Sequence, residues 1–199
     1  MPNLMEDVYT QVWERASLKN PGFCLLDEGV IDSWQLRRRM VEVKQQLSAR
    51  TPFVFRSATR FNQQRTTKFH LDGGPPHNIL MLGYEPSLVK SRLFLADHAR
   101  AARELGRDIS ELVSATMFGN DALVQPYAVE LPAFDEQRSY ILLINNSLET
   151  GVLHKAEMVT PDDSKQRVVN SAMLATEGEE ISDERLQDFL TTVATRGAY

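Results

Sequence analysis

Phe69-His70-Leu71-Asp72, followed directly by Gly73-Gly74-Pro75-Pro76, is the stretch on which the fold prediction rests. On a β-strand, residues i and i+2 point to the same face, so His70 and Asp72 would reach one cavity from the end of a strand. Much later, His154 lies in an apolar run that could bring a second imidazole to the same cavity. Two imidazoles and one carboxylate occupy one face of an octahedral metal ion and leave its other positions open. The pattern therefore predicts a metal site at the rim of a β-structure.

Each histidine also has a more ordinary explanation. A His-x-Asp pair before a turn usually faces solvent, although Asp is rarely buried without a partner. A lone histidine in an apolar strand, as His154 would be, is usually a core residue. His77 follows two prolines and is expected in a loop, whereas His98 stands beside Asp97 and is a weak alternative ligand.

A basic residue on the strand expected after His154 suggests an anion site. Arg167, Val169 and Ser171 would share one face of that strand. A guanidinium inside a barrel is costly unless it meets a buried anion, and a carboxylate is its best bidentate partner. The alternatives are that Arg167 faces water, or that Lys165, which has the same strand parity, takes its place.

The spacing of apolar residues predicts a mainly β protein with flanking helices. Short β-like runs separated by turn residues predict strands near 23–26, 52–58, 66–72, 78–84, 91–96, 123–130, 138–145, 151–159 and 166–175. Helical spacing predicts helices at 4–18 and 33–49, a helical insertion at about 98–117, and a last helix at 182–196.

These elements predict a single domain over residues 1–199. The N-terminal helices, within 1–50, would buttress a jelly-roll core at 51–176. The mouth of such a cupin-like barrel is wide enough for a metal ion and a small ligand.

Composition narrows the function classes. The apolar content of 42% and the charged content of 25% are ordinary for a globular protein. A net charge of −5 argues against bulk attraction to nucleic acid or to anionic membranes. A local basic group could still recognise an anion or be a solvated edge; its members are Arg56, Arg60, Arg65 and Lys68.

The single cysteine, Cys24, cannot form an internal disulfide, which suits a reducing cytoplasm. The segment Met1–Asp7 does not read as a signal peptide, and no apolar run is long enough to span a bilayer. We therefore expect a cytoplasmic protein.

The segment 66–174 resembles the core of the 2-oxoglutarate- and Fe(II)-dependent oxygenases, which have the double-stranded β-helix fold, and most of all their isopenicillin-synthase-like branch. The pieces that carry the resemblance are Phe69–Asp72, Asn78–Pro86, Leu143–Asn146, Val152–Lys155 and Arg167–Ser171. By this resemblance His70, Asp72 and His154 are the catalytic residues and would hold Fe(II).

The resemblance also implies a co-substrate site. 2-Oxoglutarate would chelate the metal through its keto acid end, with its far carboxylate on Arg167. Ser171, Asn78 and Tyr84 would contact 2-oxoglutarate or the substrate, although structural hydrogen bonding explains Asn78 and Tyr84 equally well.

The implied reaction consumes dioxygen and yields succinate and CO2. Relatives that halogenate have a small residue in place of the carboxylate, so Asp72 indicates hydroxylation or a related oxidation such as desaturation. The expected substrate is a small molecule, such as an amino acid or a natural-product precursor, because no module for peptides or nucleic acids is appended.

Two other classes of function fit the same residues. One is a cupin-type metalloenzyme that does not use 2-oxoglutarate, in which Arg167 would bind the substrate directly or have no role. The other is a non-catalytic jelly-roll binding protein with structural histidines. The oligomeric state is not predicted.

Overall fold

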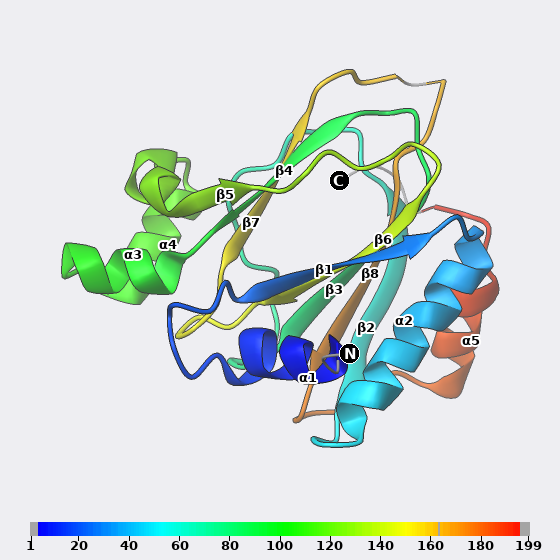
Figure 1. The fold of residues 1–199 in the computed structure, drawn as a ribbon, viewed down its shortest axis with the longest axis horizontal. Coiled ribbons are helices and arrows are strands. Elements are labelled where there is room, and N and C mark those ends of the chain that lie inside the picture. Colours follow the sequence, from blue (N-terminus) through cyan, green and yellow to red (C-terminus); the bar gives the residue numbers. More distant parts are fainter. Residues whose placement is uncertain (1–3, 163, 196–199) are drawn as a thin grey trace.

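Two antiparallel sheets form the centre of the protein in the computed structural model, which describes residues 4–162 and 164–195 (Figure 1). The larger sheet has the strand order β1-β6-β3-β8-β2, and its strands are β1 (Phe23–Gly29), β6 (Ser139–Asn145), β3 (Ile79–Tyr84), β8 (Val168–Ala175) and β2 (Val54–Asn62). The smaller sheet has the order β5-β4-β7, and its strands are β5 (Ala128–Glu130), β4 (Ser91–Ala96) and β7 (Leu153–Met158). The expected mainly β architecture with flanking helices is confirmed.

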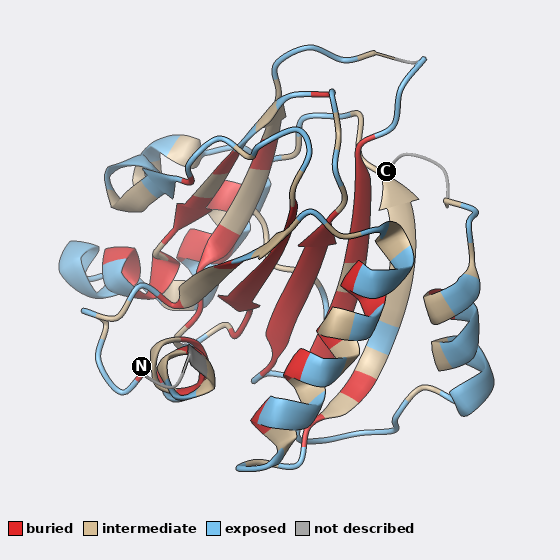
Figure 2. Ribbon diagram, turned by 45° about the vertical axis from the view of Figure 1, so that its right-hand side comes forward, coloured by how far each residue is buried: buried red, intermediate tan, exposed pale blue. Residues whose placement is uncertain are grey.

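Helices cover the outer face of the larger sheet (Figures 1 and 2). They are α1 (Leu4–Val8), which continues as a π-helical turn over Tyr9–Glu14, α2 (Ser33–Ser48) and α5 (Asp183–Thr191). A capping box starts α2, because the Asp32 side chain accepts from the Gln35 amide and the Gln35 side chain accepts from the Asp32 amide. The helix predicted at 33–49 is present with its end shifted by one residue. The helix predicted at 182–196 is shorter than expected, because it ends at Thr191, and position 196 lies outside the described residues.

Alternating residues of the larger sheet divide the core in two. On the outer face, Met81 and Leu143 pack with Leu36 and Met40 of α2. On the inner face, leucines of β3 and β6 pack with those of β4. Every residue of β3 and β6 is buried, because helices cover one side and the smaller sheet the other (Figure 2).

The predicted helical insertion consists of α3 (His98–Leu105) and α4 (Ile109–Met117), which lie at the end of the smaller sheet (Figure 1). The strand predicted at 123–130 is shorter than expected. Residues Asp121–Leu123 and Gln125–Tyr127 form 3-10 turns, and only Ala128–Glu130 joins the sheet. Pro126 explains the difference, because its ring nitrogen has no hydrogen to donate to a ladder.

The strand predicted at 66–72 is wrong except at one residue, His70, which forms an isolated bridge with His154. Two side-chain hydroxyls accept hydrogen bonds from backbone amides of β7, where a regular strand would offer its carbonyls. The Thr67 hydroxyl accepts from the amide of Ala156 at 2.9 Å, and the Thr66 hydroxyl accepts from the amide of Met158 at 3.0 Å. These two amides of β7 therefore bond to side chains of the 66–72 segment rather than to its backbone carbonyls, and no regular ladder forms there.

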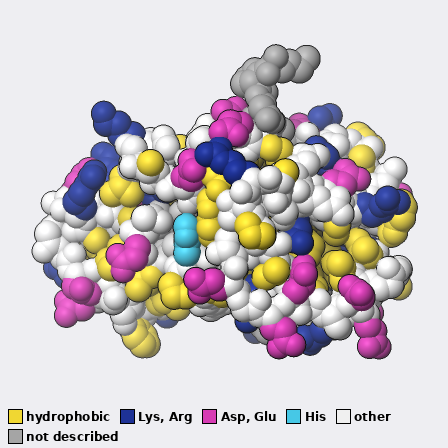
Figure 3. Space-filling model, turned by 90° about the horizontal axis from the view of Figure 1, so that it is seen from below, with side chains coloured by type: hydrophobic (Ala, Val, Ile, Leu, Met, Phe, Trp, Pro, Cys, Tyr) yellow, Lys and Arg dark blue, Asp and Glu magenta, His cyan; other side chains and the backbone are white. Residues whose placement is uncertain are grey.

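On the face shown in Figure 3, acidic and basic side chains are interspersed rather than gathered into fields of one sign. Among the helices of the described ranges, none combines the length and the apolar character needed to cross a bilayer.

A buried ion network holds α2 and the end of α5 to the larger sheet. Glu85 accepts from Arg60 at 2.9 and 3.0 Å, from Ser33 at 2.7 Å and from Asn170 at 2.9 Å. Arg37 lies 3.6 Å from the same carboxylate and also donates to a carbonyl of α5. Burial alone would raise the pKa of Glu85, but the hydrogen bonds from Arg60, Asn170 and Ser33 hold it below its ordinary value.

We expect Glu85→Gln to lower the free energy of unfolding by about 3 kcal/mol at pH 7, because it leaves two arginines around a neutral side chain. Because the pKa of Glu85 is lowered in the folded state, its contribution is present at neutral pH and is lost as the pH falls below about 4.5. Urea denaturation measures both effects. Glu136→Gln, which breaks an exposed pair with Lys90, is the control and should cost less than about 1 kcal/mol.

Candidate metal centre

A reciprocal backbone pair brings the two histidines of the candidate site together. The His70 amide donates to the His154 carbonyl at 3.1 Å, and the His154 amide donates to the His70 carbonyl at 3.0 Å. His154 is the second residue of β7, an edge strand of the smaller sheet. Residues directly opposite each other in such a pair project to the same side. The imidazole rings accordingly lie with their centroids 4.1 Å apart.

A buried asparagine fixes the third residue. The side-chain oxygen Oδ1 of Asn146 accepts from the Asp72 amide at 3.0 Å, and its side-chain nitrogen donates to the Asp72 carbonyl at 2.8 Å. The same nitrogen donates to the Asn78 side chain at 2.9 Å, and Asn78 in turn donates to the Pro75 carbonyl at 2.7 Å. The side-chain amides of Asn146 and Asn78 thus hold the loop after His70, which does not form a regular strand.

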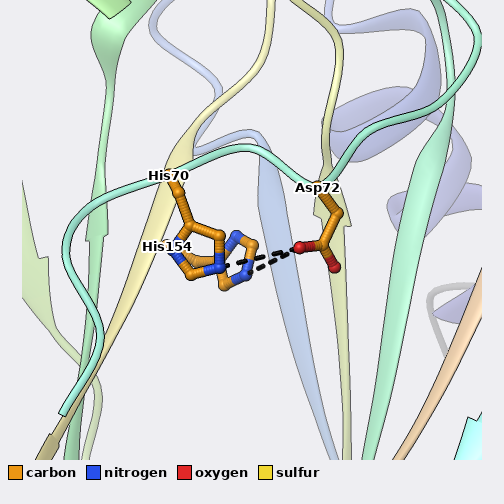
Figure 4. Close-up of side chains that lie close together, drawn as sticks. All are labelled: His70, Asp72 and His154. Atoms are coloured by element: carbon orange, nitrogen blue, oxygen red, sulfur yellow. Dashed lines mark ion pairs between the residues drawn. The ribbon is translucent and has the colours of Figure 1, made fainter. Parts of the chain in front are cut away.

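The three side chains converge on one point (Figure 4). The Asp72 Oδ1 atom lies 3.6 Å from His70 Nε2 and 4.0 Å from His154 Nε2, and one ligand atom from each residue lies within 4.8 Å of the others. Atoms about 4 Å apart in a triangle leave a centre about 2.3 Å from each, close to a metal–nitrogen bond of about 2.1 Å. The three residues therefore form a group that could hold a metal ion.

The hydrogen bonds and charges of the group suit this role. His70 Nδ1 lies 2.7 Å from the Lys68 carbonyl, which can only accept, so Nδ1 carries the proton and the lone pair of Nε2 points to the centre. Burial, and then the proximity of His70, lower the pKa of His154 well below its ordinary value, which keeps this imidazole neutral. Burial raises the pKa of Asp72, and His70 opposes the rise. A cation at the centre would restore the charged carboxylate.

The group lines a cavity of about 400 Å³ between the two sheets. Leucines of both sheets form much of its wall, and Tyr84 and Ser171 also line it. Ser171 and Tyr84 thus face the cavity, and their contact with a co-substrate or substrate stays a prediction. Asn78, by contrast, is not among the lining residues, and its side chain faces Asn146 and Pro75 instead.

Arg167 is buried, with 5% of its surface exposed, and it is not among the residues that line this cavity. Its guanidinium lies 5.1 Å from the centroid of the Tyr84 ring and 6.0 Å from that of Phe134, and it lines a second cavity of about 510 Å³. No hydrogen bond or ion pair joins its side chain to another described residue, and its Nε is buried without a partner. Burial lowers the pKa of Arg167, and Tyr84 opposes the shift.

Tyr84 lies between the metal group and Arg167. Burial raises its pKa to about 12, and both Arg167 and Asp72 act on it electrostatically. The alternative that Arg167 faces water is wrong. Lys165 is exposed and pairs with Asp162 at 3.1 Å, so it does not replace Arg167.

The other histidines have separate roles. His77 stacks on Trp13 with ring centroids 3.7 Å apart. His98 is buried, with its Nε2 2.7 Å from the Leu148 carbonyl, and burial lowers its pKa to about 4. Neither belongs to the metal group.

The basic residues singled out in the sequence have no common target. Arg56 donates to the Glu179 carbonyl and Arg60 to Glu85, whereas Arg65 and Lys68 are exposed. Asn146 is the residue of the site to which sequence reasoning gave no role. Its motif, Leu143–Asn146, was visible, but a backbone-holding amide has no signature of its own in the sequence.

Comparisons with known proteins found no matching family model and no matching curated protein. Among solved structures, the chain is similar to the Kdo hydroxylase KdoO, a non-heme Fe(II) alphaketoglutarate dependent dioxygenase, in complex with succinate and Fe(III); identity is 11%, the TM-score is 0.43, and the match covers 72% of this chain and 64% of that one. It is also similar to HygX from Streptomyces hygroscopicus with iron bound, at 12% identity and a TM-score of 0.42, over 88% of this chain and 87% of that one. The chain thus spans less than two thirds of the first of these proteins, and the function of the site is inferred below from its own geometry.

We expect Asn146→Ala to weaken divalent metal binding about 10- to 100-fold, because the Asp72 backbone loses both of its hydrogen bonds to this amide. Titration with Co(II), followed by absorption, measures the affinity. Asn145→Ala is the matched control, because Asn145 is also a buried amide but donates to Val12 and Thr150 instead of Asp72. Wild-type affinity in Asn146→Ala would contradict the role assigned to this residue.

Proposed function

We propose that this protein is an Fe(II)- and 2-oxoglutarate-dependent oxygenase that hydroxylates or otherwise oxidises a small molecule. The observation that carries the proposal is the convergence of His70, Asp72 and His154 on one point at the wall of a cavity. Two imidazoles and one carboxylate are the donors of the facial triad found in non-haem iron oxygenases, and they leave coordination positions open to substrates. Iron and 2-oxoglutarate, when bound, supply the oxidising chemistry with dioxygen, and succinate and CO2 are the co-products.

The strand arrangement supports a double-stranded β-helix as the fold of this enzyme. The strands β2, β8, β3 and β6 lie side by side in one sheet, and β7, β4 and β5 lie side by side in the other. The His70 bridge adds a fourth member to the second sheet, next to β7. Apart from β1, each sheet then has four members that face those of the other sheet, as in a jelly roll.

Arg167 is the proposed anchor for the far carboxylate of 2-oxoglutarate. It is a buried guanidinium without an anionic partner among the described residues, beside a tyrosine that lines the metal cavity. A buried cation of this kind is costly until an anion arrives. The proposed work of Arg167 and Tyr84 is to bind and orient the co-substrate.

The remaining lining residues would exclude water. Leu80, Leu82 and Leu142 cover one wall, and Leu93 and Leu95 cover the wall opposite. In an apolar enclosure, the electrostatic interactions of a bound co-substrate are stronger than in water. Asp72, as a ligand carboxylate, favours oxygen transfer or desaturation over halogenation.

A turnover assay with Fe(II) and 2-oxoglutarate tests the proposed function. We expect succinate to form slowly without a prime substrate and faster with one. Asp72→Ala and His154→Ala should each lose Co(II) binding and succinate formation, whereas His77→Ala, which removes a histidine stacked on Trp13, should keep both. Iron binding without any succinate would instead support a cupin-type enzyme that does not use 2-oxoglutarate, and no metal binding would support a binding protein.

Arg167→Ala should raise the KM for 2-oxoglutarate about 10- to 100-fold, because a charged hydrogen bond to the carboxylate is lost. Co(II) affinity should stay unchanged, since no ligand is altered. Lys165→Ala is the control and should leave the KM unchanged, because its ammonium is exposed and pairs with Asp162. An equal loss of metal affinity and 2-oxoglutarate affinity in Arg167→Ala would show a folding defect and remove the support for this anchor.

A further inference from the structure

The inner face of the larger sheet carries its side chains in three levels. The level of Tyr84 contains Val169 and Phe61 and lies beside Arg167. The next level contains Leu82, Ser171 and Thr59, and the last contains Leu80, Met173 and Ser57. Met173 lies directly against Gly74, in the loop that follows Asp72, so the last level is at the metal end of the cavity.

Three hydroxyl side chains gather at the two levels nearest the metal group. We call Ser57, Thr59 and Ser171 the hydroxyl row. All three line the cavity, and Thr59 pairs directly with Ser171 across β2 and β8. None of these hydroxyls has a hydrogen-bond partner in the part of the chain that the structure describes. Because β2 is an edge strand and Ser57 is exposed, the row leads from the edge of the sheet to the metal group.

Few charged side chains line the cavity beside the hydroxyl row apart from those of the metal group. Outside His70, Asp72 and His154, the one charged residue among those described as lining the cavity is Lys155. Its ammonium already pairs with Asp121 at 3.0 Å. An anionic or zwitterionic molecule on the row would therefore meet hydroxyls and leucines but no free counter-charge.

The other walls of the same levels are apolar. Leu80 and Leu82 continue the two levels on β3, and Leu93 and Leu95 face them from β4. A molecule seated there meets donors and acceptors on one side and aliphatic groups on the other. A polyhydroxylated ring matches this division, because its hydroxyls project from the rim while its C–H groups form the faces.

We propose that the hydroxyl row binds the prime substrate, and that this substrate is a neutral, polyhydroxylated molecule such as a sugar without phosphate or carboxylate. This inference rests on the proposed oxygenase function. It assigns different contacts to the two molecules: the metal group, Tyr84 and Arg167 serve the anionic co-substrate, and the hydroxyl row, which begins on the edge strand β2, serves the neutral substrate.

The test compares neutral sugars with charged sugar derivatives and with amino acids. Glucose, sucrose and methyl β-galactopyranoside are compared with glucose 6-phosphate, glucuronate and a set of free amino acids. Saturation-transfer NMR on the Zn(II)-loaded protein with 2-oxoglutarate measures binding, and CO2 release by the Fe(II)-loaded protein measures stimulated turnover. We expect neutral probes to bind and to stimulate turnover, and charged probes to do neither.

Isosteric variants link the binding to the row. Thr59→Val and Ser171→Ala should each weaken binding of the neutral probe about 3- to 10-fold. Thr176→Val, which removes an exposed hydroxyl just after β8, should change nothing. Thermal unfolding of each variant separates a lost contact from a lost fold, and the shape-conserving Thr59→Val keeps the test valid if Ser171→Ala is unstable.

Three results would each overturn the inference: charged probes bind preferentially, neutral probes fail to bind, or neutral probes bind Thr59→Val as tightly as the wild type. Succinate formed without any probe reports on the proposed function separately. If it forms while the neutral probes fail, only the substrate class is wrong; if it does not form, the oxygenase itself is wrong.

Discussion

The candidate site depends on one backbone pair, the two reciprocal hydrogen bonds between His70 and His154. These bonds fix which residue of the 66–72 segment faces β7. Since side chains alternate along an extended chain, a slip of one residue would turn a ligand away from the cavity. Asn146 then holds Asp72 by its backbone, so the carboxylate is placed by the same kind of interaction as the imidazoles. Backbone bonds thus set the positions, and the side chains remain free to bind.

Arg167 differs from two other buried arginines, Arg15 and Arg37, in its neighbours. Arg15 pairs with Asp97 and donates to carbonyls of the loop before β7, and Arg37 lies beside Glu85. Both therefore have the carboxylate neighbour that a buried cation needs. Arg167 is also buried, but its guanidinium lies beside the rings of Tyr84 and Phe134 and forms no ion pair with another residue of the part of the chain that the structure describes. Cation–π contacts offset only part of the desolvation cost, so an anionic ligand is the simplest reason for this arginine to be there.

The sequence predicted the elements whose patterns are local. The apolar stripe of α2 and the fully buried strands β3 and β6 follow from periodicity, and so do the inward faces of Ser171 and Tyr84. It did not predict that 66–72 departs from a regular strand, because the hydroxyls of Thr66 and Thr67 replace backbone acceptors only once β7 is beside them. The position of Asn78 was missed for a similar reason: parity placed it on the cavity face, but its partner Asn146 comes from a loop far away in the chain.

The residues of the metal group lie at sheet edges, apart from the central strands that stabilise the fold. The strands that carry most of the packing, β3 and β6, contribute no ligand to the metal group, whereas His154 comes from an edge strand and His70 and Asp72 from an irregular segment. An edge has free backbone groups, so it can take up a short segment by a few hydrogen bonds without a complete ladder. The larger sheet also has an edge strand at the cavity, β2, where the hydroxyl row begins. The well-packed central strands support the fold, and the sheet edges carry the polar groups. The chain can therefore hold a polar site in a cavity whose walls are largely apolar.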